Sequence, residues 1–246
     1  MMDELLLLSG NDIPFPEARI SIHQPRLREI AYIGEEVFFT GCEFLNFSKD
    51  MLQEKDKLNL VNQTNFEVLM SIVKDKSSLG MSTKNAILLL LTLLFPEYEI
   101  NIQDDAILLI NQNEFTTLNK MNFDEFQKII VQMFCLGRKK DNEQDYNPGG
   151  DRAKMIAEKL KKGRQRAAAA KGDGEQKIAI FSRYVSILSV GESKDMNSFM
   201  NYTVYQLYDE FERYELKQNS DVYLQARLAG AQDLEEVDNW MKDIHP

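Results

Sequence analysis

One uninterrupted apolar segment constrains the fold of this chain more than any other feature. Residues 86–95 are apolar except for Thr92, and Pro96 follows directly. Ten residues are too few to span a bilayer, and a helix that is apolar on nearly all sides must be enclosed by other elements. Proline cannot continue a helix, so we predict a buried helix from Thr83 to Phe95, capped by Ser82, at the centre of the first domain.

The composition favours a folded, cytoplasmic protein. The chain has 246 residues, of which 43% are hydrophobic, and a formal net charge of -10. This is enough apolar material for one large or two modest cores, while the acidic balance opposes nucleic-acid binding by the chain as a whole. The short run Leu5–Leu8 follows Asp3 and Glu4, which is unlike a secretory signal peptide.

Two cysteines, Cys42 and Cys135, lie within apolar helical patterns. We expect them to be buried free thiols, because two cysteines do not form a disulfide framework. A reducing compartment fits this usage.

Residues 1–137 predict a mainly helical N-terminal domain with short strands. We expect irregular structure over residues 1–18 and a strand at 19–23. Helices should begin near Pro25 and stop at Gly34, and begin again at Glu35. Thr64 and Glu67 form a capping-box signature for another helix. Over residues 98–110 the helical spacing of apolar residues gives way to a period of two, which predicts a β-hairpin packed on helices. A further helix should run from Asn122 to Gly137.

Residues 138–175 read as a charged, partly helical linker. The segment 147–150 (NPGG) is a strong structure breaker, and residues 151–171 carry a net charge of +6. Three interpretations stay open: a linker or intramolecular contact, a site for a protein partner, and a nucleic-acid site. The basic side chains concerned are Lys159, Lys161, Lys162, Arg164 and Arg166. No aromatic residues are interleaved for base stacking, so nucleic acid is disfavoured.

Residues 176–246 predict a helical C-terminal domain, which makes the overall fold mainly α with a small β element. We expect one amphipathic helix from Ile178 to Gly191 and a longer one from Thr203 to Leu228, which Asn219-Ser220 could interrupt. A final short helix should contain residues 234–244.

The chain lacks the residues that most enzymes and metal sites need. Only His23 and His245 are present, and no serine or cysteine stands in a nucleophile-elbow context. Two isolated histidines and two isolated cysteines do not form a zinc site, and no phosphate-binding glycine loop occurs. The carboxylates between 209 and 215 have helical spacing with Arg213 and fit a solvated helix face. We therefore predict a protein without catalytic residues, metal or cofactor.

Aromatic side chains recur along the C-terminal helices. Core packing is one interpretation, but tyrosine is also favoured where one side of a residue is buried and the other is wet, as at protein interfaces. This makes the following residues the candidate partner-binding set: Tyr205, Tyr208, Phe211, Tyr214, Tyr223 and Trp240.

The last hundred residues resemble a known class of phage protein. The resemblance covers residues 147–245 and rests on four segments: 181–190 (FSRYVSILSV), 201–214 (NYTVYQLYDEFERY), 221–231 (DVYLQARLAGA) and 239–245 (NWMKDIH). They are similar to morphogenesis proteins of tailed bacteriophages of Gram-positive bacteria, and in particular to tail assembly chaperones.

The resemblance implies a non-enzymatic, helical protein of the host cytoplasm that is absent from the finished virion. Such chaperones coat the tape measure protein and recruit tail tube subunits, so both are the implied partners, while self-association stays open and no membrane is implied. The C-terminal part here looks well folded rather than like a short extension. A structural virion component, such as a connector or baseplate subunit, is therefore the alternative, followed by a nucleic-acid-associated factor acting through residues 152–171.

Overall fold

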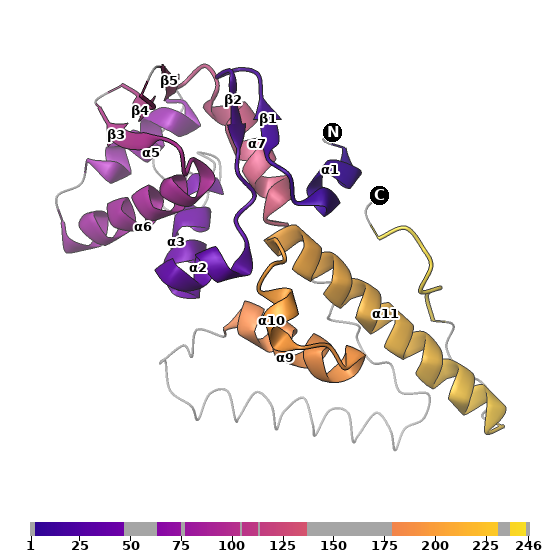
Figure 1. The fold of residues 1–246 in the computed structure, drawn as a ribbon. Helices are drawn as coiled ribbons and strands as arrows, with labels where there is room; N and C mark the ends of the chain where they lie inside the picture. The colour runs from indigo at the N-terminus through magenta and orange to yellow at the C-terminus, as the bar shows by residue number, and fades with distance from the viewer. Residues whose placement is uncertain are drawn as a thin grey trace. The chain divides into compact units, whose positions relative to one another are not determined.

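The computed structural model describes residues 3–46, 63–74, 77–103, 105–112, 114–136, 179–230 and 237–244. It consists of helices with two small antiparallel sheets, and the part after residue 179 is helical (Figure 1). This confirms the mainly α fold class with a minor β component. The predicted linker lies outside the described residues.

The N-terminus is more regular than the sequence predicts. Helix α1 (Glu4–Ser9) begins at Asp3, whose carboxylate accepts a hydrogen bond from the Leu5 N–H, and ends at Gly10, which has a positive φ of 66°. Strands β1 (Ile13–Phe15) and β2 (Ile20–Ile22) then pair antiparallel. The expectation of irregular structure over residues 1–18 was wrong, because a single capped turn and a short hairpin carry little periodic signal. The strand at 19–23 is confirmed.

The predicted helices after β2 are present. Helix α2 (Leu27–Ile33) stops at Gly34, α3 (Glu35–Asn46) follows at once, and α5 (Asn65–Val73) has the predicted capping box. Accepting a hydrogen bond from the Thr64 N–H lowers the pKa of the Glu67 carboxyl. Helix α6 (Ser78–Leu94) is longer than predicted, since Ser77 rather than Ser82 caps it, and Ile87, Leu90 and Leu91 are fully buried.

The predicted hairpin is part of a three-stranded sheet. Strands β3 (Glu99–Ile102) and β4 (Ile107–Ile110) pair as expected, and β5 (Phe115–Leu118) adds to β4. The third strand was missed because it is four residues long and contains no alternation of apolar and polar residues. Helix α7 (Phe123–Met133) follows, with an apolar stripe that packs against α3 and α5.

The C-terminal part contains three helices. Helix α9 (Ile180–Glu192) and the short α10 (Met196–Phe199) lead into α11 (Val204–Leu228), which passes through Asn219 and Ser220 without interruption. The predicted final helix is wrong for residues 237–244, which form turns and bends. A turn in which the Lys242 N–H donates to the Asn239 carbonyl oxygen at 2.9 Å and two hydrogen bonds from Arg213 hold this segment.

Side chains from both ends of the chain form a single hydrophobic cluster. Phe181 of α9 lies 5.7 Å from Phe38 and 5.0 Å from Phe39 between ring centroids, and the Phe181 N–H donates to the Glu35 carboxylate at 2.8 Å. Residues 1–136 and 180–246 accordingly belong to one compact unit. The predicted three-part division stays a prediction, since its middle part is not described, but its first and third parts share a core.

Helices α3 and α6 cross closely at Gly41, which generates a first prediction. A Cβ at Gly41 would lie 3.0 Å from the Ala86 carbonyl oxygen and 3.0 Å from Leu90 Cβ. Gly41→Ala should therefore reduce the free energy of unfolding by about 1–3 kcal/mol, even though alanine is the better helix former. Urea denaturation measures this; Glu43→Ala, at an exposed position of α3, should change stability by less than about 0.5 kcal/mol. Stabilisation by Gly41→Ala would contradict the close crossing.

The two thiols differ in environment, which generates a second prediction. Cys42 is 1% exposed, and burial raises the pKa of its thiol far above the ordinary value, whereas Cys135 is only half-buried, and no disulfide involves either. In the folded protein iodoacetamide should modify Cys135 while Cys42 stays unmodified, and both should react in urea. Mass spectrometry of digested protein reads out both sites, with Cys135→Ser as control; equal labelling of Cys42 in the folded state would refute the packing of α3.

Candidate functional site

The candidate site is built on α11, and its first half is anchored in the core. Thr203 and Gln206 form a capping box, and the Gln206 side-chain amide also donates to the Leu8 carbonyl oxygen of α1 at 2.7 Å. The buried residues of α11 all lie in this half: Val204, Tyr205, Leu207 and Phe211. The helix is therefore held at its beginning.

Several of the predicted partner-binding aromatics belong to the core rather than to the surface. Tyr205 is 4% exposed and Phe211 9%, and the Phe211 ring stacks on Tyr184 of α9 at 3.8 Å. Tyr208 and Tyr214 are half-buried, and burial raises the pKa of the Tyr208 hydroxyl far above its ordinary value. These four residues lie on the half of α11 that packs against α9 and the N-terminal elements. Tyr223 is half-buried as well, and of the six predicted residues Trp240, at 40%, is the exposed one. Whether any of the six binds a partner stays a prediction.

A lysine between α9 and α10 fixes the turn that precedes α11. The Lys194 ammonium pairs with Glu192 at 2.7 Å and with Glu210 of α11 at 2.8 Å, and these two carboxylates raise the pKa of Lys194 well above its ordinary range. Gly191 is needed beside it, because a Cβ there would collide with the Tyr214 ring.

The second half of α11, from Lys217 onward, contains no buried residue and continues past α9 and α10 (Figure 1). Leu224 is 54% exposed and Leu228 88%. Beside them Arg227 donates to the Tyr223 hydroxyl at 3.1 Å and lies over its ring, 5.7 Å from the centroid. An amphipathic helix normally covers its apolar side chains, so this end has the character of an interface.

The C-terminal segment, residues 237–244, lies along α11 because Arg213 holds it. The guanidinium donates to the Trp240 carbonyl oxygen at 2.8 Å and to the Lys242 carbonyl oxygen at 2.7 Å, and Ile244 is buried. Trp240 and Met241 remain 40% and 67% exposed.

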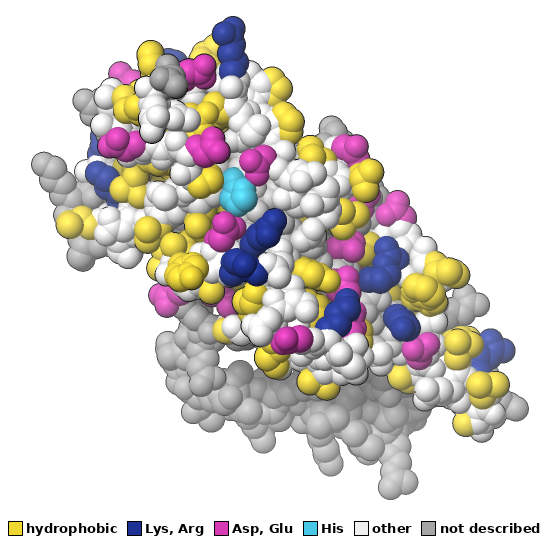
Figure 2. All heavy atoms as spheres, in the orientation of Figure 1, with side chains coloured by type: hydrophobic (Ala, Val, Ile, Leu, Met, Phe, Trp, Pro, Cys, Tyr) yellow, Lys and Arg dark blue, Asp and Glu magenta, His cyan; other side chains and the backbone are white. Residues whose placement is uncertain are grey.

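Helical geometry places these features on one side of α11. Arg213 and Leu224 are eleven residues apart, close to three full turns, and Leu228 follows four residues later. The tethered segment and the two leucines therefore share a face, opposite Val204. We call Leu224, Leu228, Val237, Trp240 and Met241 the tip surface. Figure 2 shows hydrophobic side chains interleaved with both basic and acidic ones over α11 and this segment.

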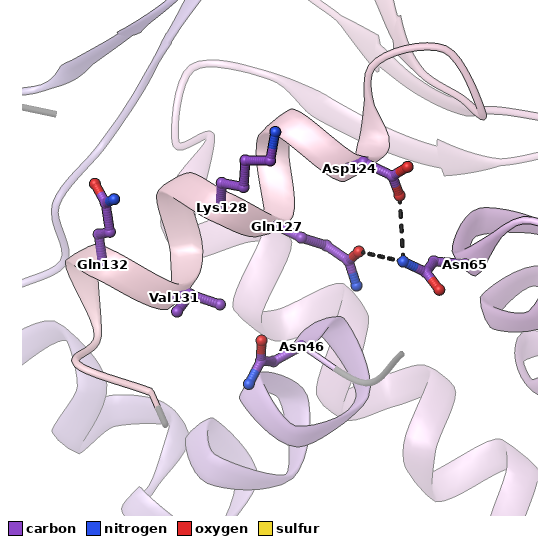
Figure 3. Close-up of a pocket in the computed structure, with 7 residues that line it drawn as sticks. All are labelled: Asn46, Asn65, Asp124, Gln127, Lys128, Val131 and Gln132. Atoms are coloured by element: carbon purple, nitrogen blue, oxygen red, sulfur yellow. Dashed lines mark hydrogen bonds between the residues drawn. The ribbon is translucent and has the colours of Figure 1, made fainter. Parts of the chain in front are cut away.

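A shallow polar depression lies between the end of α3, the start of α5 and α7 (Figure 3). Its volume is about 470 Å³, and its lining includes Asn46, Asp124 and Gln132. Asn65 donates to Asp124 at 3.3 Å and to Gln127 at 3.1 Å, while the Gln127 amide donates to the Leu45 carbonyl oxygen. These bonds join three helices, and the lining offers hydrogen bonding but no nucleophile and base in contact.

His23 lies between two carboxylates at the end of β2. Its Nδ1 is 2.9 Å from Asp12 and its Nε2 is 3.2 Å from Glu29, and in Figure 2 the histidine is flanked by acidic side chains. Glu29 also accepts from the Arg26 N–H at 2.6 Å. The imidazole is partly exposed, and its two ring nitrogens link the residue before β1 to α2.

The described residues contain no candidate for a metal site or for a membrane span. No group of three or more His, Cys, Asp or Glu side chains in the part of the chain that the structure describes is placed to hold a metal ion. Over the same ranges, no helix has both the length and the apolar character needed to cross a membrane. The predicted basic segment, residues 152–171, and His245 lie outside the described residues.

Comparison with known proteins bears on the class of the helical C-terminal part, α9–α11. Residues 173–245 match the family model of the second domain of YomV, a phage-derived Bacillus protein family. The match covers most of the stretch that resembles phage morphogenesis proteins, and it fits a bacteriophage association. No curated protein and no solved structure gives a significant match to the chain.

Of the tip surface, only Trp240 was among the partner-binding residues predicted from the sequence; the other four residues were not. Leu224 and Leu228 lie opposite the apolar stripe used to find the helix, and Arg213 was read as part of a solvated face. A usable signal existed: Leu224 and Leu228 lie off the stripe that Val204 begins, although Val222 is still on it.

The Arg213 tether generates a third prediction. Arg213→Ala should release the C-terminal segment while lowering the free energy of unfolding by less than about 1 kcal/mol, because the bonds are near the surface. Trp240 is the single tryptophan of the chain, so its fluorescence quenching by acrylamide, which should increase, reports the release directly. Arg227→Ala is the matched control and should leave quenching unchanged. Unchanged quenching in Arg213→Ala would contradict the tether.

Proposed function

We propose that this chain is a non-enzymatic tail assembly chaperone of a bacteriophage, which binds the tape measure protein and recruits tail subunits during morphogenesis. The match of residues 173–245 to a phage-derived family supports the phage setting, and the resemblance of the C-terminal helices to tail morphogenesis proteins supports the role. The protein would act in the host cytoplasm and use no cofactor.

The observation that carries this proposal is the unburied second half of α11 together with the tethered C-terminal segment. The first half of the same helix is fixed by a capping box and by four buried side chains, so the tip surface is presented from a rigid base. A rigidly presented apolar surface fits protein recruitment, because little ordering of the surface is needed on binding. In this proposal the helical N-terminal part binds the tape measure protein.

A pull-down tests the proposal. Tagged chain isolated from an infected-cell lysate should recover tape measure or tail tube protein, identified by mass spectrometry. The control for non-specific capture is the tagged Gly41→Ala chain, used at a temperature at which this variant is unfolded. Recovery of neither tail protein would count decisively against the chaperone role.

One observation favours a second candidate, a structural virion component such as a connector or baseplate subunit. The C-terminal helices share a core with residues 1–136 and do not form a separate extension. Mass spectrometry of purified particles separates the two candidates. A chaperone should be absent from the particles, whereas a connector or baseplate subunit should be present in a fixed ratio to other tail proteins.

A further inference from the structure

His23 is placed so that both nitrogens of its ring face carboxylate oxygens. The Nδ1 atom lies 2.9 Å from Asp12 Oδ1, and the Nε2 atom lies 3.2 Å from Glu29 Oε2. A neutral imidazole has one N–H donor and one lone pair, so it satisfies only one of these contacts, whereas the imidazolium donates at both nitrogens. The geometry is therefore the one that the charged ring requires.

The groups packed around His23 favour a positive charge on its ring. One of the two carboxylates comes from the segment before β1 and the other from α2. The His23 backbone N–H donates to the Leu94 carbonyl oxygen at 2.9 Å, at the C-terminal and therefore negative end of α6. Arg26 and Arg28, the basic residues at the start of α2, are exposed, and Figure 2 shows the histidine between acidic side chains, with basic ones beyond one of them. The His23 side chain is 23% exposed, so solvent screens these contacts only in part.

We propose that His23 is a pH-sensitive link, which in its charged form ties the segment before β1 to α2 and on deprotonation releases Glu29. This inference is independent of the proposed function. The contact with Glu29 is the one that is lost, because this carboxylate keeps a second donor, the Arg26 N–H at 2.6 Å, and because the contact with Asp12 is the shorter of the two. The neutral ring then keeps its proton on Nδ1, and its Nε2 lone pair repels the Glu29 carboxylate.

Helix α2 is the element through which the link reaches the C-terminal helices. The Leu27 N–H donates to the Tyr202 carbonyl oxygen at 2.9 Å, and the Arg28 N–H donates to the Met200 carbonyl oxygen at 3.1 Å. The first turn of α2 thus holds the turn that precedes α11. Protonation of His23 adds an attachment to this first turn, and deprotonation removes it while the backbone bonds stay in place.

Stability from this link is greatest in mildly acidic solution. The folded chain holds a proton on His23 that the unfolded chain, which lacks the two neighbouring carboxylates, holds less tightly. The contribution is present where the ring is charged and the carboxylates are still ionised, and it is lost as the pH rises through the titration of the ring. Ordinary imidazole titrates near about pH 6.5 and ordinary carboxyl groups near about pH 4, so about pH 5.5 and about pH 9 separate the two states.

Urea unfolding of the full-length chain at these two pH values tests the inference. Glu29→Gln removes the charge but keeps a side-chain oxygen to accept the Arg26 N–H, so the capping box survives. This variant should raise the unfolding equilibrium constant about fivefold at about pH 5.5 and less than about twofold at about pH 9. The matched control is Glu29→Gln in a His23→Gln chain, where the effect should be less than about twofold at both pH values.

Nitrogen NMR of the imidazole shows which contact is released. His245 is the other histidine of the chain, so His245→Gln leaves the ring of His23 as the single imidazole signal. At about pH 5.5 both ring nitrogens should carry protons, and at about pH 9 the remaining proton should be on Nδ1, facing Asp12.

Three outcomes would overturn the inference. The first is an effect of Glu29→Gln that is equal at the two pH values, which is what a purely structural contact would give. The second is a pH-dependent effect of Glu29→Gln that persists in the His23→Gln chain. The third is a neutral ring with its proton on Nε2, which would show that the contact with Glu29 is the one that is kept.

Discussion

The rest of the structure depends on the backbone junction between the start of α2 and the turn before α11. The Leu27 N–H donates to the Tyr202 carbonyl oxygen at 2.9 Å, the Arg28 N–H donates to the Met200 carbonyl oxygen at 3.1 Å, and Arg26 and Thr203 form a β-bridge. These bonds use the free N–H groups at the first turn of α2, which need partners in any case. The junction positions the first turn of α11, and through it the whole length of that helix.

Because α11 is held only at its beginning, its two halves have different roles. The first half completes the core with Leu207 and Phe211, and the second half presents apolar side chains such as Leu224 and Leu228 that are exposed among the described residues. Core packing and exposed apolar surface are thereby separated along a single helix. The described residues around His23 and in the polar depression contribute hydrogen bonds between elements, which is a structural use of polar groups.

Local signals in the sequence predicted much of the fold. Capping residues such as Thr64 and Thr203 and stop signals such as Gly34 are short-range, so helices α2, α3, α5 and α11 could be read directly. Helix α1, strand β1 and strand β5 were missed because each is only three to six residues long and is stabilised by the neighbours it packs on. The C-terminal segment was predicted as a helix from its apolar spacing, but Arg213 holds its carbonyl groups instead.

The same distinction between local signals and tertiary packing applies to the candidate site. The sequence by itself determined that the C-terminal part is helical and rich in aromatic residues, since spacing and composition are local properties. Only the tertiary structure decided which aromatics are buried: Tyr205 and Phe211 enter the core because α1 and α9 cover them, while Leu224 and Leu228 are left outside. A helical stripe records which residues share a face, but burial depends on which other segments reach that face.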